Sequence, residues 1–335
     1  MGANKLVEKK KGLPDLVQLT LGDRIKRLED KITKLLDIDN PLLSQIATYI
    51  CMSKGKRIRP IFLFLCSSLG GYKGDGDIFV GTIVEFIHAA TLLHDDVIDQ
   101  SPLRRGKASA NSKWGDRLPI LVGDYLFAKS FFWLVENKQY EIMAAVSSAT
   151  ASLTNGEILQ LRKMGRMDVS EELYLDIIGE KTAFFISMCC KIGGILGGLS
   201  DSLLDKVTDF GMDVGMAFQL VDDALDFIAD EKKLGKPVVN DFREGNCTLP
   251  LIYSLKMAQP EEKIETERIS KKKFFDNDDI QWILSLVDKY RGTHYTFDKA
   301  RSYIARAKEK LSAFDHSTSL QALLDLADYI VERDY

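Results

Sequence analysis

The chain of 335 residues carries 45 Lys and Arg against 49 Asp and Glu, a formal net charge of −4 at pH 7. Hydrophobic residues make up 45% of the chain and charged residues 28%, which is typical of a soluble globular protein. Binding to a phosphate backbone needs a clear basic excess, so this balance excludes nucleic acid as a partner. The first 20 residues contain no apolar signal-peptide segment. The five cysteines have no Cys-x-x-Cys spacing, which favours reduced thiols and a cytoplasmic location.

Apolar residues recur with a helical period along most of the chain, and the alternation of a sheet protein is nearly absent from the sequence. Residues 21–36 place leucine and isoleucine on one face and charges on the other. The helices predicted after them span residues 79–99, 118–136, 139–164, 170–195 and 201–230, and shorter amphipathic helices follow in 261–335. No linker or repeat interrupts the pattern. We therefore expect one all-α domain over residues 1–335, with residues 1–20 poorly ordered.

One segment tests whether the protein is soluble. Residues 182–200 contain a single charged residue, Lys191, over nearly the length of a membrane span. The same segment holds four glycines and is flanked by charged residues. A helix that is apolar on all sides is also what the centre of a large bundle needs. We therefore interpret the segment as a buried core helix and expect no membrane anchor.

Two groups of aspartates each end an apolar helical run. The six residues are Asp95, Asp96 and Asp99 in the first group and Asp222, Asp223 and Asp226 in the second. Aspartates four residues apart share a helix face at about 5–6 Å, and like charges at that spacing destabilise a helix unless something neutralises them. One such group could be a solvated helix end, but two in apolar surroundings indicate a site. Oxygen ligands without histidine suit Mg²⁺, which proteins hold together with substrate phosphates.

Basic clusters beside turn residues supply the opposite charge. Lys56 and Arg59 follow a glycine, and Arg104 and Arg105 lie one loop after the first aspartate group. Arginine binds phosphate oxygens through two parallel hydrogen bonds, and lysine adds a point charge. Most basic pairs beside turns are merely solvated. The position directly after an aspartate group favours a polyphosphate site instead.

In this order the motifs resemble those of the trans-isoprenyl diphosphate synthases, the polyprenyl synthase family of the isoprenoid synthase fold. The resemblance runs from about Leu21 to the end of the chain and is greatest to long-chain members such as octaprenyl diphosphate synthases. The matching segments are residues 55–60, 95–99 with 104–106, 122–125, 156–160, 181–182, 219 with 222–226, and 234–237 leading to 248–250. One departure is Lys54, where the family usually has glycine; it concerns only the local backbone.

The resemblance implies a helical bundle around a central active-site cavity. It also implies head-to-tail condensation of isopentenyl diphosphate onto an allylic diphosphate, which gives an all-trans product. Ionisation of the allylic C–O bond needs preorganised cations beside the leaving diphosphate, and Mg²⁺ would supply them. By the resemblance, the ligands of Mg²⁺ are Asp95, Asp99 and Asp222, with Asp96, Asp223 and Asp226 as supporting residues.

The resemblance also implies roles for the cationic and polar residues. Those expected to hold the allylic diphosphate are Arg104, Lys181 and Lys236. Those expected to hold isopentenyl diphosphate are Lys56, Arg59, His88 and Arg105. Thr182 and Gln219 have side-chain oxygens suited to stabilising the carbocation. Spacing alone, two helical turns before Asp95, would leave His88 as an ordinary core residue.

Product length depends, in the family that the chain resembles, on the residues one turn before the first aspartate group. Here these residues are Ala90 and Thr91, which are small, and Ile87 and Val84 follow farther along the helix. None is aromatic, so we expect a long product in the C30–C50 class of quinone side chains. Candidates for the floor of the channel that would hold the growing product are Leu153, Val146 and Met143, on the helix before Glu157. A short-chain farnesyl or geranylgeranyl diphosphate synthase is the alternative.

Three other classes of protein fit parts of the sequence. A His-Asp phosphohydrolase fits His94 followed by Asp95, but it needs several histidines on successive helices and leaves the second aspartate group unexplained. A terpene cyclase shares the first aspartate motif, but it needs no second diphosphate site, and Lys56 and Arg59 would then have no role. A subunit of a heteromeric prenyl synthase would be expected to lose aspartate motifs, and both are intact. The resemblance implies a homodimer, and an apolar product implies transient membrane contact during release.

Overall fold

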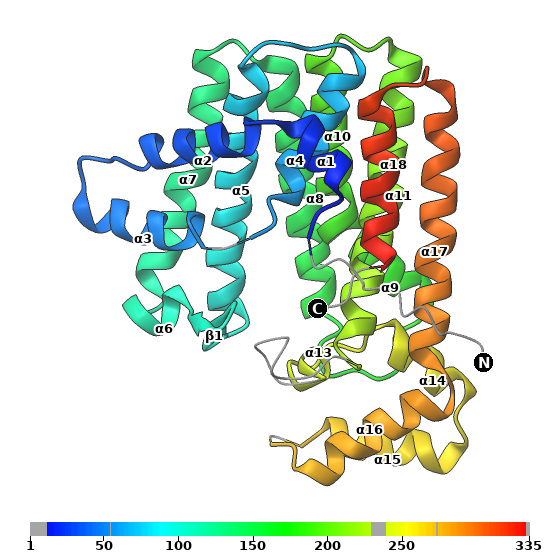
Figure 1. Cartoon of the computed structure of the whole chain (residues 1–335). Coiled ribbons are helices and arrows are strands. Elements are labelled where there is room, and N and C mark those ends of the chain that lie inside the picture. Colours follow the sequence, from blue (N-terminus) through cyan, green and yellow to red (C-terminus); the bar gives the residue numbers. More distant parts are fainter. Residues whose placement is uncertain (1–11, 54, 229–238, 273, 333–335) are drawn as a thin grey trace, which may run out of the picture.

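The computed structural model describes residues 12–53, 55–228, 239–272 and 274–332, and in them the chain forms a bundle of helices with one short hairpin (Figure 1). The hairpin pairs β1 (Leu103–Arg104) with β2 (Lys107–Ala108) in antiparallel register, with Leu103 opposite Ala108. The expected all-α class is therefore confirmed. All five cysteines are buried and free, as the sequence predicted.

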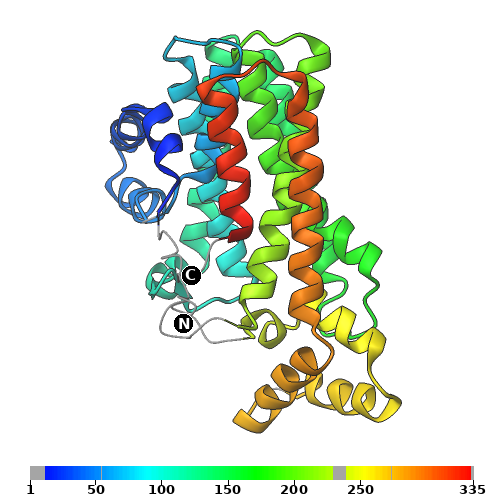
Figure 2. The same cartoon turned by 45° about the vertical axis from the view of Figure 1, so that its right-hand side comes forward.

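The long helices run side by side in both views of the molecule (Figures 1 and 2). The first part of the chain forms α1 (Asp15–Leu21), α2 (Arg24–Leu35), α3 (Pro41–Cys51), α4 (Ile58–Leu69), α5 (Gly76–Ile98), α6 (Ala110–Trp114), α7 (Arg117–Glu136) and α8 (Tyr140–Leu161). It continues as α9 (Glu171–Ile178), a π-helical turn (Gly179–Ala183), α10 (Phe184–Leu196), α11 (Asp201–Leu225), α13 (Asn240–Arg243), α14 (Leu249–Met257), α15 (Pro260–Ser270), α16 (Asn277–Lys289), α17 (Gly292–Lys310), a 3₁₀ turn (Leu311–Ala313) and α18 (Thr318–Glu332).

The helix α10 lies in the core, where it packs against α4 and α11. Cys189 and Cys190 on it are completely buried. Glycine lets the backbones come close, because a Cβ on Gly193 would lie 2.4 Å from the carbonyl oxygen of Leu63 in α4. The interpretation of this apolar segment as a buried core helix is therefore confirmed.

Some boundaries differ from the predictions. The helix expected over residues 170–195 is divided by the π-helical turn into α9 and α10. In the C-terminal part, α17 spans 19 residues, so the expectation of shorter helices there is wrong for this one. Residues 15–20 belong to α1, whose Val17 is fully buried and which packs against α18. The expectation of poor order is therefore wrong for residues 15–20, and residues 1–11 lie outside the described part.

Two helices are long and apolar enough to cross a membrane, judged by length and composition alone. In α5, 78% of the most apolar window is buried inside the molecule, which is what a core helix requires. In α7, only 33% of the corresponding window is buried. Apolar surface on α7 thus remains uncovered in the single chain.

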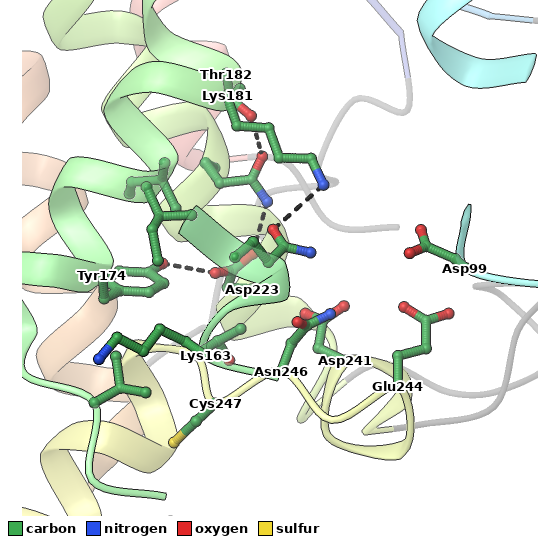
Figure 3. Close-up of a pocket in the computed structure, with 16 residues that line it drawn as sticks. Asp99, Lys163, Tyr174, Lys181, Thr182, Asp223, Asp241, Glu244, Asn246 and Cys247 are labelled. Carbon is green, nitrogen blue, oxygen red and sulfur yellow. Dashed lines mark hydrogen bonds between the residues drawn. The ribbon is translucent and has the colours of Figure 1, made fainter. Parts of the chain in front are cut away.

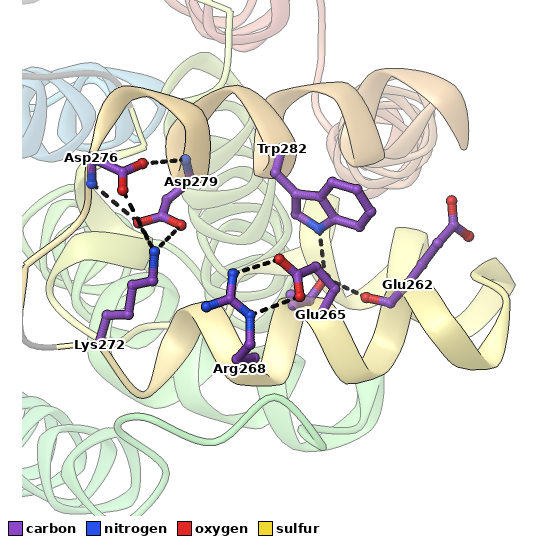
Figure 4. Close-up of polar contacts among 8 residues, drawn as sticks. Glu262, Glu265, Arg268, Lys272, Asp276, Asp279 and Trp282 are labelled. Atoms are coloured by element: carbon purple, nitrogen blue, oxygen red, sulfur yellow. Dashed lines mark hydrogen bonds and ion pairs between the residues drawn. The ribbon is translucent and has the colours of Figure 1, made fainter.

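The helices α15 and α16 extend from one end of the bundle and are joined by polar contacts (Figures 2 and 4). Lys272 donates to both carboxylate oxygens of Asp279, at 2.5 and 2.7 Å. Asp279 and Asp276 also cap the first turn of α16 reciprocally. The indole N–H of Trp282 donates to Thr266 across the pair at 3.3 Å. Hydrogen bonds therefore join this pair of helices, and neither aspartate group lies on it.

Candidate active site

A pocket lies at the C-terminal ends of α5 and α11 (Figure 3). Its lining includes Asp99, which caps α5, and Asp223 in the last turn of α11, so both aspartate groups contribute to it. Lys181, Thr182 and Gln219 line the same pocket. The structure thus brings together five of the residues that the sequence singled out.

Negative charge in the first aspartate group is only partly compensated by the protein. Burial raises the pKa of Asp95 to about 7; the charge of Glu157 adds to this rise, and Lys181 opposes it. Burial also raises the pKa of Asp99. A bound cation would remove this destabilisation, and the ligands available are oxygen atoms only. The donor set therefore fits a hard divalent cation.

Asp96 has a different environment from Asp95 and Asp99. It is completely buried and accepts hydrogen bonds from Arg104, with Nε and one terminal nitrogen each 2.6 Å from the same carboxylate oxygen. Burial raises the pKa of Asp96, and the charge of Arg104 opposes that rise. Asp96 thus holds Arg104, a residue of the hairpin, beside the end of α5. A supporting role for Asp96 beside the metal ligands stays a prediction.

The three aspartates of the second group also have separate environments. Asp223 accepts hydrogen bonds from the Tyr174 hydroxyl at 2.6 Å and from the Gln219 amide at 2.7 Å. Burial raises the pKa of Asp223 to about 7, and these two bonds oppose the rise. Asp226 accepts from the backbone N–H of Asp241 at 3.0 Å. Asp222 is half-buried on the same helix end.

Lys181 and Thr182 lie on the π-helical turn between α9 and α10. A π turn bulges out of the regular helix, and such turns occur frequently at functional sites. The turn is held close to α8, because a Cβ on Gly156 would lie 2.8 Å from the backbone nitrogen of Lys181. Lys181 Nζ lies 2.6 Å from a carboxylate oxygen of Glu157. Burial lowers the pKa of Lys181, but the charges of Glu157 and Asp95 outweigh it and raise the pKa overall.

A second pocket is lined by four cationic or basic residues that the sequence grouped together. These residues are Lys56, Arg59, His88 and Arg105. The two pockets lie along neighbouring parts of α11, since Phe218 lines the second and Gln219 the first. The charge of Asp222 acts on Arg59, so the second aspartate group is close to this pocket. Ala89 and Leu92 of α5 complete part of its wall. An anion bound here would therefore lie near the second aspartate group.

His88 is a neutral partner of the cations in this second pocket. Burial and the charge of Arg59 lower its pKa well below the ordinary value. Arg59 has only hydrogen-bond donors, so its contact of 3.2 Å with Nε2 makes His88 the acceptor. Burial lowers the pKa of Arg59, and Asp222 is among the charges that oppose this. His88 therefore orients Arg59 without adding positive charge.

Arg105 is held at the rim of the second pocket by Ser53. It donates to the backbone oxygen of Ser53 at 3.3 Å and to the hydroxyl at 3.2 Å. A Cβ at position 55 would lie 2.7 Å from the guanidinium, so Gly55 leaves room for it. Arg57, between these segments, instead donates to the Cys51 carbonyl at 2.8 Å. It also lines the second pocket and forms an ion pair with Glu85 at 2.5 Å, although the sequence left it out of the site.

The four residues expected to set product length are all buried in α5. Val84, Ile87 and Ala90 are fully buried, and Thr91 donates its hydroxyl to the His88 carbonyl at 2.8 Å. Within the described residues, neither of the two pockets is lined by them. Phe86, on another face, packs against Trp133 of α7 with ring centroids 5.7 Å apart. Control of chain length by these residues stays a prediction.

Several residues of the first pocket were not assigned a role from the sequence. Glu157 and Gln160, one turn apart on α8, both contact Lys181, the latter at 3.3 Å. Their i, i+3 spacing places both on one helix face, and this could have indicated from the sequence that they share a partner. Tyr174 and Asp241 reach the aspartates from distant segments and have no such signal. Lys236, expected to hold the allylic diphosphate, and Lys54 lie outside the described residues.

Within the described segments, no three His, Cys, Asp or Glu side chains lie close enough to hold a metal ion by themselves. This agrees with the usual manner of Mg²⁺ binding, in which one or two carboxylates share the ion with substrate phosphates. The ligands still missing would come from a diphosphate.

A helical bundle whose two aspartate-bearing helix ends adjoin a cationic pocket defines an isoprenoid synthase fold. The family model for polyprenyl synthetase matches residues 40–287, and the chain belongs to this family.

Known proteins are similar over almost the whole chain. The octaprenyl diphosphate synthase of Haemophilus influenzae is 32% identical over 325 residues, which cover 96% of this chain and 97% of that protein. A short chain isoprenyl diphosphate synthase of Methanothermobacter thermautotrophicus is 33% identical, covering 92% and 95%. The structure of a polyprenyl synthase from Caulobacter crescentus, complexed with calcium and isoprenyl diphosphate, is 34% identical and covers 97% and 99% with a TM-score of 0.92.

The buried contact between Asp96 and Arg104 should contribute to stability. Asp96→Asn keeps the size but loses the charge, so we expect the free energy of unfolding to fall by about 1–3 kcal/mol, measured by urea denaturation. Asp168→Asn is the matched control, because the Arg166–Asp168 pair is exposed, at 53% and 67%, and should show no measurable change. Equal effects of the two substitutions would contradict this account of Asp96.

Proposed function

We propose that this protein is a prenyltransferase that condenses isopentenyl diphosphate head-to-tail onto an allylic diphosphate and makes an all-trans polyprenyl diphosphate. The observation that carries the proposal is the pair of adjoining pockets. One is lined by aspartates and Lys181, which suits a diphosphate held with divalent cations. The other is lined by Lys56, Arg59 and Arg105, which suits a second diphosphate. Condensation of two diphosphates requires two such sites side by side.

The allylic substrate would react in the first pocket. Its C1–O bond breaks heterolytically, the electron pair leaves with the diphosphate, and an allylic cation remains. Lys181 and Arg104 are the described cations suited to the negative charge that develops on the leaving group. The oxygen atoms of Thr182 and Gln219 are suited to the carbocation. When bound, Mg²⁺ would neutralise diphosphate charge, and Asp95, Asp99 and Asp222 are the residues that would hold it.

Isopentenyl diphosphate would be held in the second pocket, with its double bond toward the cation. The double-bond electrons form the new C–C bond with C1 of the allylic cation, which moves the positive charge to the tertiary carbon. Loss of one proton from the adjacent carbon then gives a new allylic diphosphate, ready for another cycle. Orientation of this kind lowers a barrier by several kcal/mol. No described side chain is an evident base, and the released diphosphate is suited to take the proton.

We propose a long-chain product, in the C30–C50 class that forms quinone side chains. Small residues at Ala90 and Thr91 support this, as does similarity to an octaprenyl diphosphate synthase. A short-chain farnesyl or geranylgeranyl product is the alternative, since the chain is similar to a short-chain enzyme to the same degree. A subunit of a heteromeric synthase is the other alternative, against which both aspartate groups are intact.

We propose that two copies of the chain form a homodimer through α7. This helix is apolar along its length, yet most of its apolar window is uncovered. Leu121, Phe132 and Val135 are 62%, 53% and 45% exposed, far more than such side chains usually are in a monomer. A second copy would cover them by the same face in a two-fold arrangement.

We also propose a cytoplasmic location. Five free, buried thiols fit a reducing compartment. The long apolar product would then need transient membrane contact for its release.

Product analysis tests the proposed activity directly. The protein is incubated with labelled isopentenyl diphosphate, farnesyl diphosphate and Mg²⁺, and the products are separated by chromatography. We expect chain elongation to C30–C50. Mainly C20 product would contradict the long-chain proposal. No elongation by the protein alone would favour the heteromeric alternative or, with phosphate release, a hydrolase.

The size of residue 90 should set the product length. Ala90→Phe introduces an aromatic ring into a fully buried position on α5, so we expect a shorter product in the same assay. The control is Ala313→Phe, the same change at an exposed position of the 3₁₀ turn. Unchanged length in Ala90→Phe would remove this residue from the channel wall.

Metal binding should depend on diphosphate, because no described group of three acidic side chains forms a complete metal site. We expect Mg²⁺ and inorganic diphosphate together to raise the thermal unfolding temperature by several degrees, and each alone to raise it much less. Asp99→Asn should remove most of the joint effect. A full shift with Mg²⁺ alone would show a preformed metal site instead.

The dimer is tested by molar mass in solution, measured by light scattering after gel filtration. The wild-type protein is expected as a dimer and the double variant Leu121→Asp, Phe132→Asp as a monomer. Leu19→Asp is the control, since Leu19 is 76% exposed on α1 and should leave the dimer intact. A monomeric wild type, or a dimeric double variant, contradicts the interface on α7.

A further inference from the structure

A continuous chain of hydrogen bonds connects the helix α9 to the pocket. The Tyr174 hydroxyl donates to Oδ2 of Asp223 at 2.6 Å. The Gln219 amide donates to the other oxygen, Oδ1, at 2.7 Å. The Thr182 hydroxyl then donates to the amide oxygen of Gln219 at 2.9 Å. Figure 3 shows Tyr174 to the left of Asp223, with a dashed line for the hydrogen bond between them, and Thr182 above.

The direction of these bonds follows from the chemistry of the groups. In its ionised form Asp223 only accepts hydrogen bonds, so the NH₂ of Gln219 faces Asp223 and its oxygen faces Thr182. Thr182 has a single hydroxyl hydrogen, and the amide oxygen takes it. The Thr182 oxygen is left with its lone pairs and without a hydrogen for the pocket that it lines.

The opposite orientation of the amide would reverse this polarity. With its NH₂ toward Thr182, Gln219 would donate to the hydroxyl oxygen, and the hydroxyl hydrogen would be free to turn into the pocket. A hydrogen atom there would repel a carbocation, whereas a lone pair stabilises it. The Gln219 amide therefore determines whether this wall of the pocket is favourable to positive charge.

We propose that Tyr174 is a positioning residue that acts on the allylic cation through Asp223 and Gln219. Asp223 has two donors, one on each oxygen, and together they fix the plane of the carboxylate. Without the Tyr174 hydroxyl the carboxylate could rotate, and Gln219 would lose its fixed acceptor. This inference rests on the proposed prenyl transfer, since only that reaction places a cation beside Thr182.

A purely structural role of Tyr174 is the alternative, because the ring is 4% exposed and belongs to the packing of α9. The chain provides a matched control for that role. Tyr290 donates to Glu262 at the same distance, 2.6 Å, at the contact between α16 and α15 and away from both pockets. Tyr174→Phe and Tyr290→Phe each remove one hydroxyl that is bonded to a carboxylate, and only the first is connected to the pocket.

The test compares single-turnover rates of C–C bond formation and steady-state KM values. We expect Tyr174→Phe to lower the single-turnover rate about tenfold, with KM for isopentenyl diphosphate unchanged within about twofold, because the second pocket is not altered. Tyr290→Phe should keep the wild-type rate. A wild-type rate in Tyr174→Phe, or an unfolding temperature much lower than that of Tyr290→Phe, overturns the proposal in favour of a structural role.

A double-mutant cycle with Thr182→Val shows whether Tyr174 acts through Thr182. If it does, adding Tyr174→Phe to Thr182→Val should lower the single-turnover rate by at most about a further twofold, because the Thr182 oxygen that Tyr174 helps to orient is already absent. If the rate loss of the double variant equals the product of the two single losses, the two residues act independently, and the proposal is overturned. A wild-type protein without any elongation contradicts the proposed function itself, whereas an active wild type with an unaffected Tyr174→Phe contradicts only this inference.

Discussion

Carboxylates at the ends of two apolar helices are the constraint on which the rest of this structure depends. A buried negative charge is strongly unfavourable unless a cation or hydrogen-bond donors accompany it. Among the described contacts, Asp96 accepts from Arg104, and Asp223 accepts from Tyr174 and Gln219. Asp226 accepts from the backbone N–H of Asp241. Burial nevertheless raises the pKa of both Asp95 and Asp223 to about 7, so the ionised carboxylates are only partly compensated by these groups. Ligand binding is where we expect the remaining compensation to come from.

Adjacent aspartates on one helix have different partners for a geometric reason. Neighbouring residues on a helix point about 100° apart, so Asp95 and Asp96 cannot face the same partner. Asp96 turns into the protein and fixes Arg104, while Asp95 stays with Lys181 and Glu157 beside the pocket. The cations are held in the same manner in the second pocket, where neutral His88 accepts from Arg59. In both pockets, interior partners hold the groups that we propose bind diphosphate.

The helical period was enough to predict the bundle, and the i, i+4 spacing of aspartates singled out the two carboxylate groups. Lys181, Thr182 and Gln219 were assigned only through the family resemblance. These patterns did not indicate the π-helical turn, because local apolar patterning is the same for one continuous helix and for two helices joined by such a turn. Nor did they indicate Tyr174, whose partner Asp223 lies 49 positions away and is found only by tertiary packing. The exposed face of α7 was equally hidden, since an apolar helix has the same composition whether its own chain or a second copy covers it.

The central claim is that the two aspartate groups hold divalent ions around one diphosphate. Its most direct measurement is a crystal structure with Mn²⁺ and a non-hydrolysable allylic diphosphate analogue, in which anomalous scattering locates the ions. The account predicts ions against Asp95, Asp99 and Asp222, with the diphosphate in contact with Lys181. Ions elsewhere, or a diphosphate bound without contact to either aspartate group, would contradict it.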